Sequence, residues 1–197
     1  MLLPSLGISA DTWEVNRKPD PKLEMNGIYA LHNDVYKNWY SLTQVQGLKW
    51  MNHRNRTSRL ILQKNGKPLA TLRITKPQPT IKIVANNGSE PKVIFKVDMR
   101  AEMLELWQTA DEKELEKAAN EKVRGDIVAS FRYSLSNGAD LFNIEHVLYR
   151  KHFKQWKQLT NNGQITYMHE QMPEMHVNVH LTDSGMYKLQ RKLIPYD

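Results

Sequence analysis

The clearest chemical feature of this chain is residues 35–89, which contain ten basic side chains and no acidic one. Because the whole chain has a formal net charge of +7, subtracting the +10 of this stretch leaves about −3 for the rest. The positive charge is therefore regional, and clustered positive potential attracts polyanions. The ten residues are Lys37, Lys49, Arg54, Arg56, Arg59, Lys64, Lys67, Arg73, Lys76 and Lys82.

Nucleic acid is the polyanion that we expect here, bound mainly through its phosphates and therefore with little sequence selectivity. Three nearby aromatic residues, Trp39, Tyr40 and Trp50, are candidates for stacking on bases. Two other interpretations stay open: an acidic protein partner, and a solvated sheet face whose lysines protect edge strands from aggregation. The candidate phosphate contacts in this stretch are Lys49, Arg54, Arg56, Arg59, Lys64, Lys67, Arg73 and Lys76.

A second basic stripe follows near residue 150, on a segment with helical spacing. Its cations, Arg150, Lys154 and Lys157, recur at i, i+4 and i+7 and are added to the candidate contacts. A parallel aromatic stripe could form a ridge for single-stranded nucleic acid, or it could be core with the cations on its wet side. The aromatic residues are Tyr149, Phe153 and Trp156.

Metal binding is not expected. His176 and His180 would lie on one face of a strand, about 13 Å apart at the usual rise per residue, which is too far to share one ion. No glycine-rich phosphate loop occurs either, so no cofactor is expected.

Residues 27–53 carry one enzymatic resemblance. Gly27-Ile28-Tyr29, followed by Tyr40-Ser41-Leu42, resembles the signature of GIY-YIG nucleases. That family has a short hairpin with two tyrosines, then a helix with an arginine and a His or Tyr, and later a metal-binding glutamate. The resemblance implies that Lys49 and His53 stand near the helix positions, and it makes a divergent nuclease a remote alternative; Glu102 and Glu105 are candidates for the glutamate by position.

Strand-like runs and turn signals fill residues 23–98. The Asn65-Gly66 pair predicts a type I′ hairpin turn, which needs positive φ at both positions. Val93, Phe95 and Val97 alternate with polar residues, which is typical of a half-buried strand. We expect an antiparallel sheet of about six strands, at 23–32, 35–44, 59–63, 68–74, 80–85 and 92–98.

Helical spacing then takes over in residues 99–160, where two or three packed helices are expected. Met99, Met103 and Ala110 indicate a first helix. A possible capping box at Thr109 and Glu112 begins a second, which ends before Asn137-Gly138. Its apolar stripe is Leu115, Ala119, Val123, Ile127, Phe131 and Leu135.

A third helix is expected over residues 140–159, and residues 164–197 should form a strand pair around Pro173 and a short helix over 182–193. Strands, then helices, then a strand pair indicate the α+β class. We expect residues 1–22, which hold three prolines, to be an extended arm, and residues 23–197 to form a single α+β domain.

The chain has no cysteine, which fits a reducing compartment, and no apolar run long enough to span a bilayer. Its N-terminus is a poor signal peptide, so a cytoplasmic protein is expected, or one assembled there into a larger particle. The leading hypothesis is a non-enzymatic nucleic-acid-binding protein without a membrane partner. The alternative is an assembly subunit of a virion or other machine, homo- or hetero-oligomeric, whose arm and edge strands pair with neighbouring subunits.

Overall fold

The computed structural model describes residues 1–9, 14–15, 18–32, 34–86, 89–161, 164–165 and 172–183. Its internal contacts divide the chain into two compact units. The first unit comprises residues 1–48 and 129–171, and the second comprises residues 49–128 and 172–197. None of the described helices is long and apolar enough to cross a membrane.

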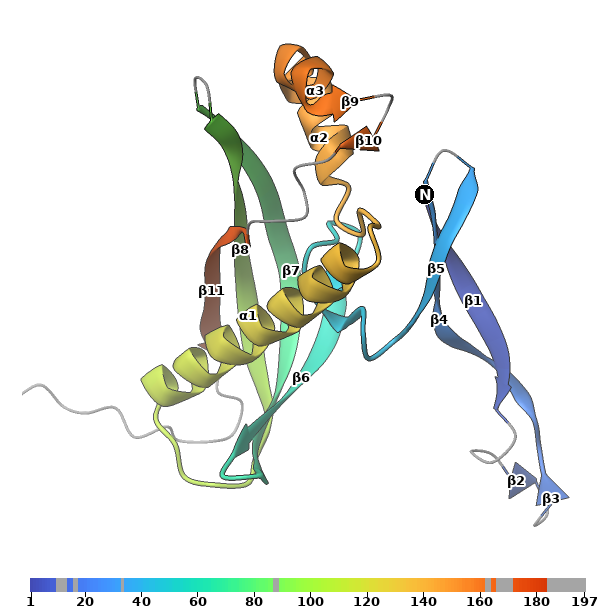
Figure 1. The fold of residues 1–197 in the computed structure, drawn as a ribbon. Coiled ribbons are helices and arrows are strands. Elements are labelled where there is room, and N and C mark those ends of the chain that lie inside the picture. The colour runs from blue at the N-terminus through green and yellow to red at the C-terminus, as the bar shows by residue number, and fades with distance from the viewer. Residues whose placement is uncertain are drawn as a thin grey trace, which may run out of the picture. The chain divides into compact units, whose positions relative to one another are not determined.

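The second unit is built on a four-stranded sheet in the order β11-β8-β7-β6 (Figure 1). Its strands are β6 (Thr57–Lys64), β7 (Lys67–Asn86), β8 (Ser89–Leu106) and β11 (Glu174–Asp183). The first three pair antiparallel, whereas β11 runs parallel to β8. A parallel neighbour requires a crossover connection, and helix α1 (Glu112–Ser136) belongs to the segment that provides it.

The core of this unit lies between the sheet and the N-terminal part of α1. Leu115, Ala119, Val123 and Ile127 are fully buried at steps of four, as their spacing predicts. The sheet supplies alternate residues to the same core, and one row consists of Leu60, Leu72 and Met103.

The predicted hairpin turn is confirmed: Asn65 and Gly66 have φ values of 54° and 73° between β6 and β7. The next two predicted strands, however, form the single strand β7. A bulge between Thr75 and Gln78 accommodates Lys76, which has a φ of 48°, so the strand continues through the proline-containing stretch.

The helix expected from Met99 to Ala110 is wrong, because β8 continues to Leu106. Met99, Ala101 and Met103 are buried, and Arg100 between them is exposed. Residues four apart share a face in a strand as well as in a helix, so the spacing of the two methionines fits both. Pairing with β7 decides between the two structures.

Helix α1 begins close to the predicted position, but its cap is different. The Asp111 carboxylate accepts a hydrogen bond from the backbone N–H of Glu114 at 2.7 Å, which is an N-terminal capping contact. The helix ends at Ser136, and Gly138 follows with a φ of 59°, as the Asn-Gly signal predicts.

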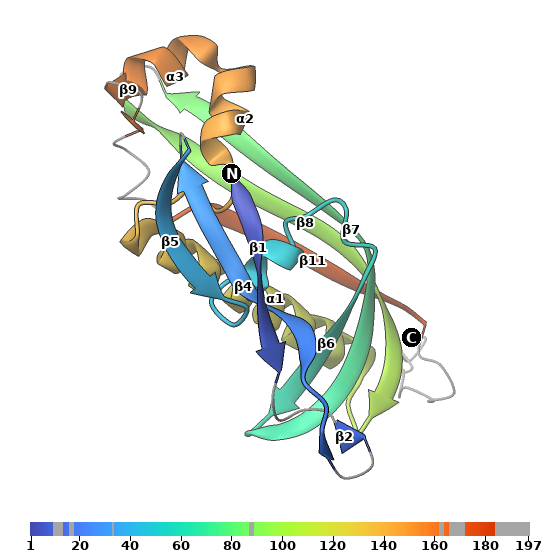
Figure 2. The same ribbon diagram turned by 90° about the vertical axis from the view of Figure 1, so that its right-hand side faces the viewer.

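The first unit contains a three-stranded antiparallel sheet in the order β1-β4-β5 (Figure 2). The strands are β1 (Leu2–Ser9), β4 (Lys22–His32) and β5 (Val35–Ser41). The expected arm therefore contains an extended segment that pairs with β4. A short pair, β2 (Glu14–Val15) and β3 (Lys18–Pro19), and a 3-10 turn, η1 (Gln46–Lys49), complete the N-terminal elements.

The remaining elements are short. The helix expected over 140–159 is two helices, α2 (Ile144–Lys151) and α3 (Phe153–Leu159), separated at His152, whose φ of −138° is not helical. Strands β9 (Thr160–Asn161) and β10 (Gln164–Ile165) follow.

The predicted C-terminal strand pair is only partly correct, because β11 pairs with β8. Of the strand expected before Pro173, only residues 164–165 are described, and the rest lies outside the described residues. Of the helix expected over 182–193, residues 182–183 belong to β11, and the others also lie outside the described residues. The α+β class is confirmed, with the strands divided between sheets rather than gathered in one. The single domain over 23–197 stays a prediction.

Candidate functional site

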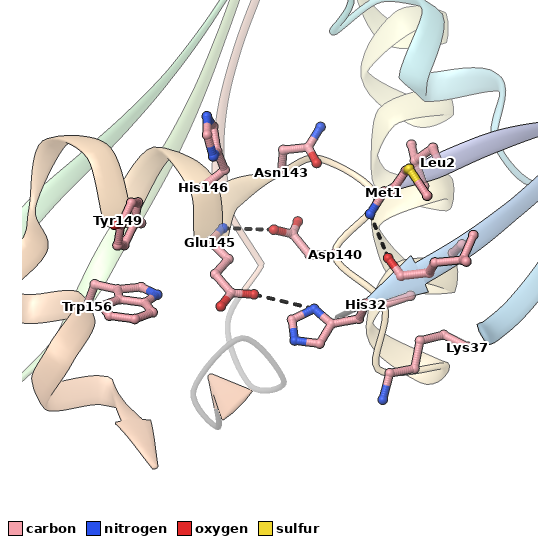
Figure 3. A pocket seen from close by; sticks show the side chains of 13 residues that line it. Met1, Leu2, His32, Lys37, Asp140, Asn143, Glu145, His146, Tyr149 and Trp156 are labelled. Carbon is pink, nitrogen blue, oxygen red and sulfur yellow. Dashed lines mark hydrogen bonds and ion pairs between the residues drawn. The ribbon is translucent and has the colours of Figure 1, made fainter. Parts of the chain in front are cut away.

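A pocket of about 560 Å³ lies within the first unit, between the β4–β5 hairpin and helices α2 and α3 (Figure 3). Its wall mixes both signs of charge with aromatic surface, and no short motif in the sequence points to it as a site. The polar and aromatic residues that line it include His32, Lys37, Asp140, Glu145, His146, Tyr149 and Trp156.

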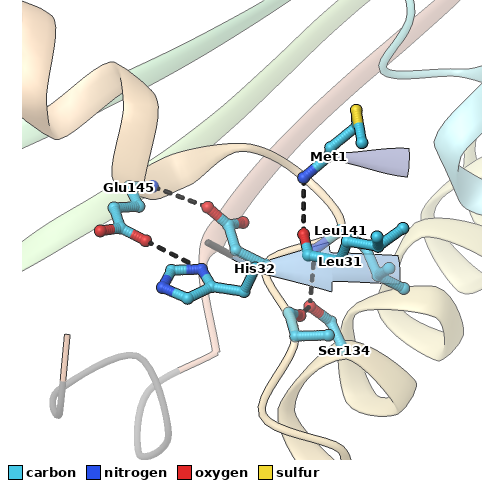
Figure 4. Close-up of polar contacts among 8 residues, drawn as sticks. Met1, Leu31, His32, Ser134, Leu141 and Glu145 are labelled. Carbon is cyan, nitrogen blue, oxygen red and sulfur yellow. Dashed lines mark hydrogen bonds and ion pairs between the residues drawn. The ribbon is translucent and has the colours of Figure 1, made fainter. Parts of the chain in front are cut away.

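An ion pair crosses this pocket from strand to helix. Nδ1 of His32, the last residue of β4, lies 3.6 Å from Oε2 of Glu145 in the first turn of α2 (Figure 4). Both side chains are half-buried, and the pair is charged on both sides only when the imidazole is protonated. The contact therefore links the β-hairpin to α2.

Asp140 forms the floor of the same region. Its Oδ2 accepts the backbone N–H of Glu145 at 2.8 Å, while its Oδ1 is buried with no hydrogen-bond partner among the described residues. Burial raises the pKa of this carboxyl, against the opposing effect of the backbone N–H groups of Glu145 and Ile144.

The loop that carries Asp140 is fixed by Ser134 on α1. The Ser134 hydroxyl donates to the carbonyl of Ala139 and accepts the N–H of Leu141 at 3.2 Å (Figure 4). Ser134 is buried, so these bonds are shielded from water. The pocket thus combines a positioned carboxyl, an ion pair and two aromatic rings, which suits a small polar molecule better than a polyanion.

The candidate phosphate contacts do not form one surface within a described unit. Lys49, Arg54, Arg56, Arg59, Lys64, Lys67, Arg73 and Lys76 belong to the second unit, and Arg150, Lys154 and Lys157 belong to the first. Two of them already contact acids of this chain: Lys64 lies 2.5 Å from Glu114, and Arg73 lies 3.3 Å from Glu102 on the neighbouring strand.

Lys49 is also unsuited to phosphate. Its Nζ lies 4.3 Å from the centre of the Trp50 ring, and burial lowers its pKa. The expected stacking platforms Tyr40 and Trp50 are fully buried. The indole Nε1 of Trp50 donates to Asp126 at 3.1 Å instead of meeting solvent.

The residues of the nuclease resemblance do not converge. Tyr29 pairs with Trp39 and Tyr40 pairs with Ile28, so the two tyrosines project from opposite faces of the β4–β5 hairpin. Tyr40 is buried, whereas Tyr29 is exposed. The residues described after the hairpin form only the four-residue 3-10 turn η1, which ends at Lys49, in place of the α-helix that the resemblance implies.

The fold and the pocket define a two-unit α+β protein with a sheet covered by a long helix. Residues 26–185 match the family model described as "Spore germination B3/ GerAC like, C-terminal", and the chain belongs to that family. It also resembles a solved structure titled "Crystal Structure of the GerBC protein", with a TM-score of 0.69 and 17% identity. That match covers 82% of this chain and 52% of the GerBC chain, so this chain corresponds to about half of that protein. No curated protein matches the chain.

Membership of this family corrects the functional predictions. The nucleic-acid-binding, virion-subunit and nuclease interpretations are wrong, and so is nucleic acid as the partner. The nucleic-acid prediction failed because a count of charges along the sequence does not show which acidic residues the basic ones meet in the fold. Part of the basic stretch over residues 35–89 forms ion pairs with acidic residues of α1 and β8, which lie outside that stretch.

Proposed function

We propose that this chain serves as a protein-binding part of a spore germination receptor. The observation that carries the proposal is the family match, which spans residues 26–185 and therefore most of the chain. The likeness to the GerBC structure supports the same fold independently of sequence. Its partners are then other proteins of the receptor.

The structure is consistent with a binding role. The described pocket mixes charges and aromatic rings, and the three-stranded sheet carries exposed apolar side chains such as Leu23 and Tyr29. Such features recognise ligands and proteins without requiring a catalytic group.

The proposal is tested in spores of the host. A strain lacking this gene is compared with the parent and with a complemented strain, across a panel of nutrient germinants, by the fall in absorbance as spores rehydrate. We expect slower or absent germination with at least one nutrient, restored by complementation. Normal germination of the deleted strain with every nutrient would refute the proposal.

The class of partner is tested separately by crosslinking a tagged copy in spores. Crosslinked complexes should survive nuclease treatment and contain further receptor proteins. Complexes that disappear with nuclease would refute the proposal.

A further inference from the structure

Helices α2 and α3 carry three aromatic side chains whose rings contact one another. Tyr149 and Phe153 meet edge to face with their ring centres 5.6 Å apart. Tyr149 meets Trp156 in the same way at 4.9 Å (Figure 3), and the rings of Phe153 and Trp156 are stacked at 5.6 Å. These contacts hold the cluster in one arrangement before a partner arrives, which lowers the entropy lost on binding.

This aromatic cluster is exposed to solvent. The buried residues of the helix pair are Ile144 and Leu148 on α2, whereas none of the seven residues of α3 is buried. Tyr149 and Phe153 have exposed fractions of 48% and 53%. Single exposed apolar residues are normal on a protein surface, but apolar surface gathered in one place marks a site of interaction.

Four cations accompany the aromatic residues. Residues 146–161 contain no acidic residue, so the four give this stretch a formal charge of +4. All four side chains are exposed. None of the ion pairs among the described residues involves any of them, so their charge is available to a partner. They are Arg150, Lys151, Lys154 and Lys157, and together with Tyr149, Phe153 and Trp156 we call them the aromatic–basic surface.

Helical spacing places the cations beside the rings. Arg150, Lys154 and Lys157 each follow an aromatic residue by one position within the same helix. One position corresponds to about 100° around a helix, so each cation flanks its ring instead of lying on the opposite side. The long aliphatic stems of Lys and Arg let the charged groups extend outward next to the rings.

Composition and charge favour a lipid surface over a protein as the partner. The cores of protein–protein interfaces are depleted in lysine, whereas three of these four cations are lysines. Segments that lie on membranes combine aromatic residues with Lys and Arg, so that the rings enter the boundary between headgroups and acyl chains. Each cation near an anionic leaflet strengthens binding by about fivefold.

We propose that the aromatic–basic surface binds a membrane that contains anionic lipids. The rings would enter the headgroup region to a depth of about 5–10 Å, and the four cations would contact lipid phosphates. The inference rests on the residues of α2 and α3 alone and is independent of the role in germination.

The test is flotation of the purified chain with vesicles of phosphatidylcholine, either alone or with about 30% phosphatidylglycerol. We expect binding only to the anionic vesicles, and weaker binding at high salt, which screens the charges. Replacing Arg150, Lys154 and Lys157 with Gln should weaken binding about 100-fold, because three headgroup contacts are lost. None of these three residues lines the described pocket, so the loss would not come from there.

The matched control removes the same charge from the second unit, by replacing Arg54, Arg56 and Arg59 with Gln. These three side chains are exposed too. Binding of this control variant should stay within about threefold of that of the parent, because only the charge at the lipid contact is felt strongly.

A second measurement follows the rings. The chain has no cysteine, so Phe153→Cys can be labelled with an environment-sensitive dye, whose emission should shift to the blue with anionic vesicles. Ile61→Cys on β6 is the matched control, because Ile61 is 54% exposed and Phe153 is 53% exposed. The emission of the dye at position 61 should not change.

Failure of the parent chain to float with anionic vesicles at low salt would overturn the proposal. Equal binding of the parent and of the variant with Gln at 150, 154 and 157 would overturn it as well. If that variant floated like the parent but lost its crosslinks to receptor proteins in spores, the surface would belong to a protein partner and the proposal would fall.

Discussion

Asp126 on α1 should stabilise the second unit chiefly through the indole of Trp50. Trp50 is fully buried, and its Nε1 donates to Asp126 Oδ2 at 3.1 Å. Asp126→Ala leaves this N–H buried without an acceptor, which costs about 1–3 kcal/mol. The second contact, from Lys122 at 2.7 Å, involves a half-exposed lysine and adds less than about 1 kcal/mol.

Alanine has a higher helix propensity than aspartate, which offsets up to about 0.7 kcal/mol of this loss. The free energy of unfolding should therefore fall by about 1–3 kcal/mol in total. The assay is urea unfolding followed by circular dichroism and tryptophan fluorescence at pH 7. Asp126→Asn is the matched control, because its amide oxygen can still accept the indole N–H, and it should lose less than half as much. Equal stability of Asp126→Ala and the parent protein would refute the assigned hydrogen bond.

Three further predictions concern backbone and buried charge. Gly27→Ala places a Cβ 2.3 Å from the carbonyl oxygen of Tyr40 and should lower unfolding free energy by about 1–3 kcal/mol; an unchanged urea midpoint contradicts this. Gly66→Val, at φ 73° with nothing within 4 Å, should cost about 1–2 kcal/mol from backbone strain alone, checked by melting temperature. Burial raises the pKa of Asp140 above its ordinary value of 3.8, so the protonated carboxyl stabilises the fold below pH 3.8 and this stabilisation is lost as the pH rises through the folded pKa. The free energy of unfolding of Asp140→Asn should therefore rise relative to that of the parent between about pH 4 and pH 7. A difference that stays constant over this pH range contradicts the prediction.

Local residue patterns correctly predicted the elements whose pattern fits only one kind of structure. The α1 stripe from Leu115 to Phe131 is confirmed, because the Asn137-Gly138 stop signal marks the end of a helix. The Asn65-Gly66 turn is confirmed too, because an Asn-Gly pair between two strand-like runs fits one type of turn. Met99 and Met103 fit both a helix and a strand, and long-range pairing with β7 decided the outcome.

The pocket could not be predicted for a related reason. His32 and Glu145 are separated by 113 residues, from 32 to 145, and meet only because the β4–β5 hairpin and α2 belong to one unit. Neither residue stands in a short motif. The count of charges along the sequence also misled, because Arg73 on β7 forms an ion pair with Glu102 on the neighbouring strand β8. Glu102 lies outside the acid-free stretch of residues 35–89.

The most direct test of the central claim is the germination of spores that lack the gene of this chain, measured beside the parent and a complemented strain. If this chain acts in a germination receptor, spores that lack it should germinate more slowly than the parent with at least one nutrient, and complementation should restore the rate. Spores that lack the gene and germinate as fast as the parent with every nutrient would contradict the account.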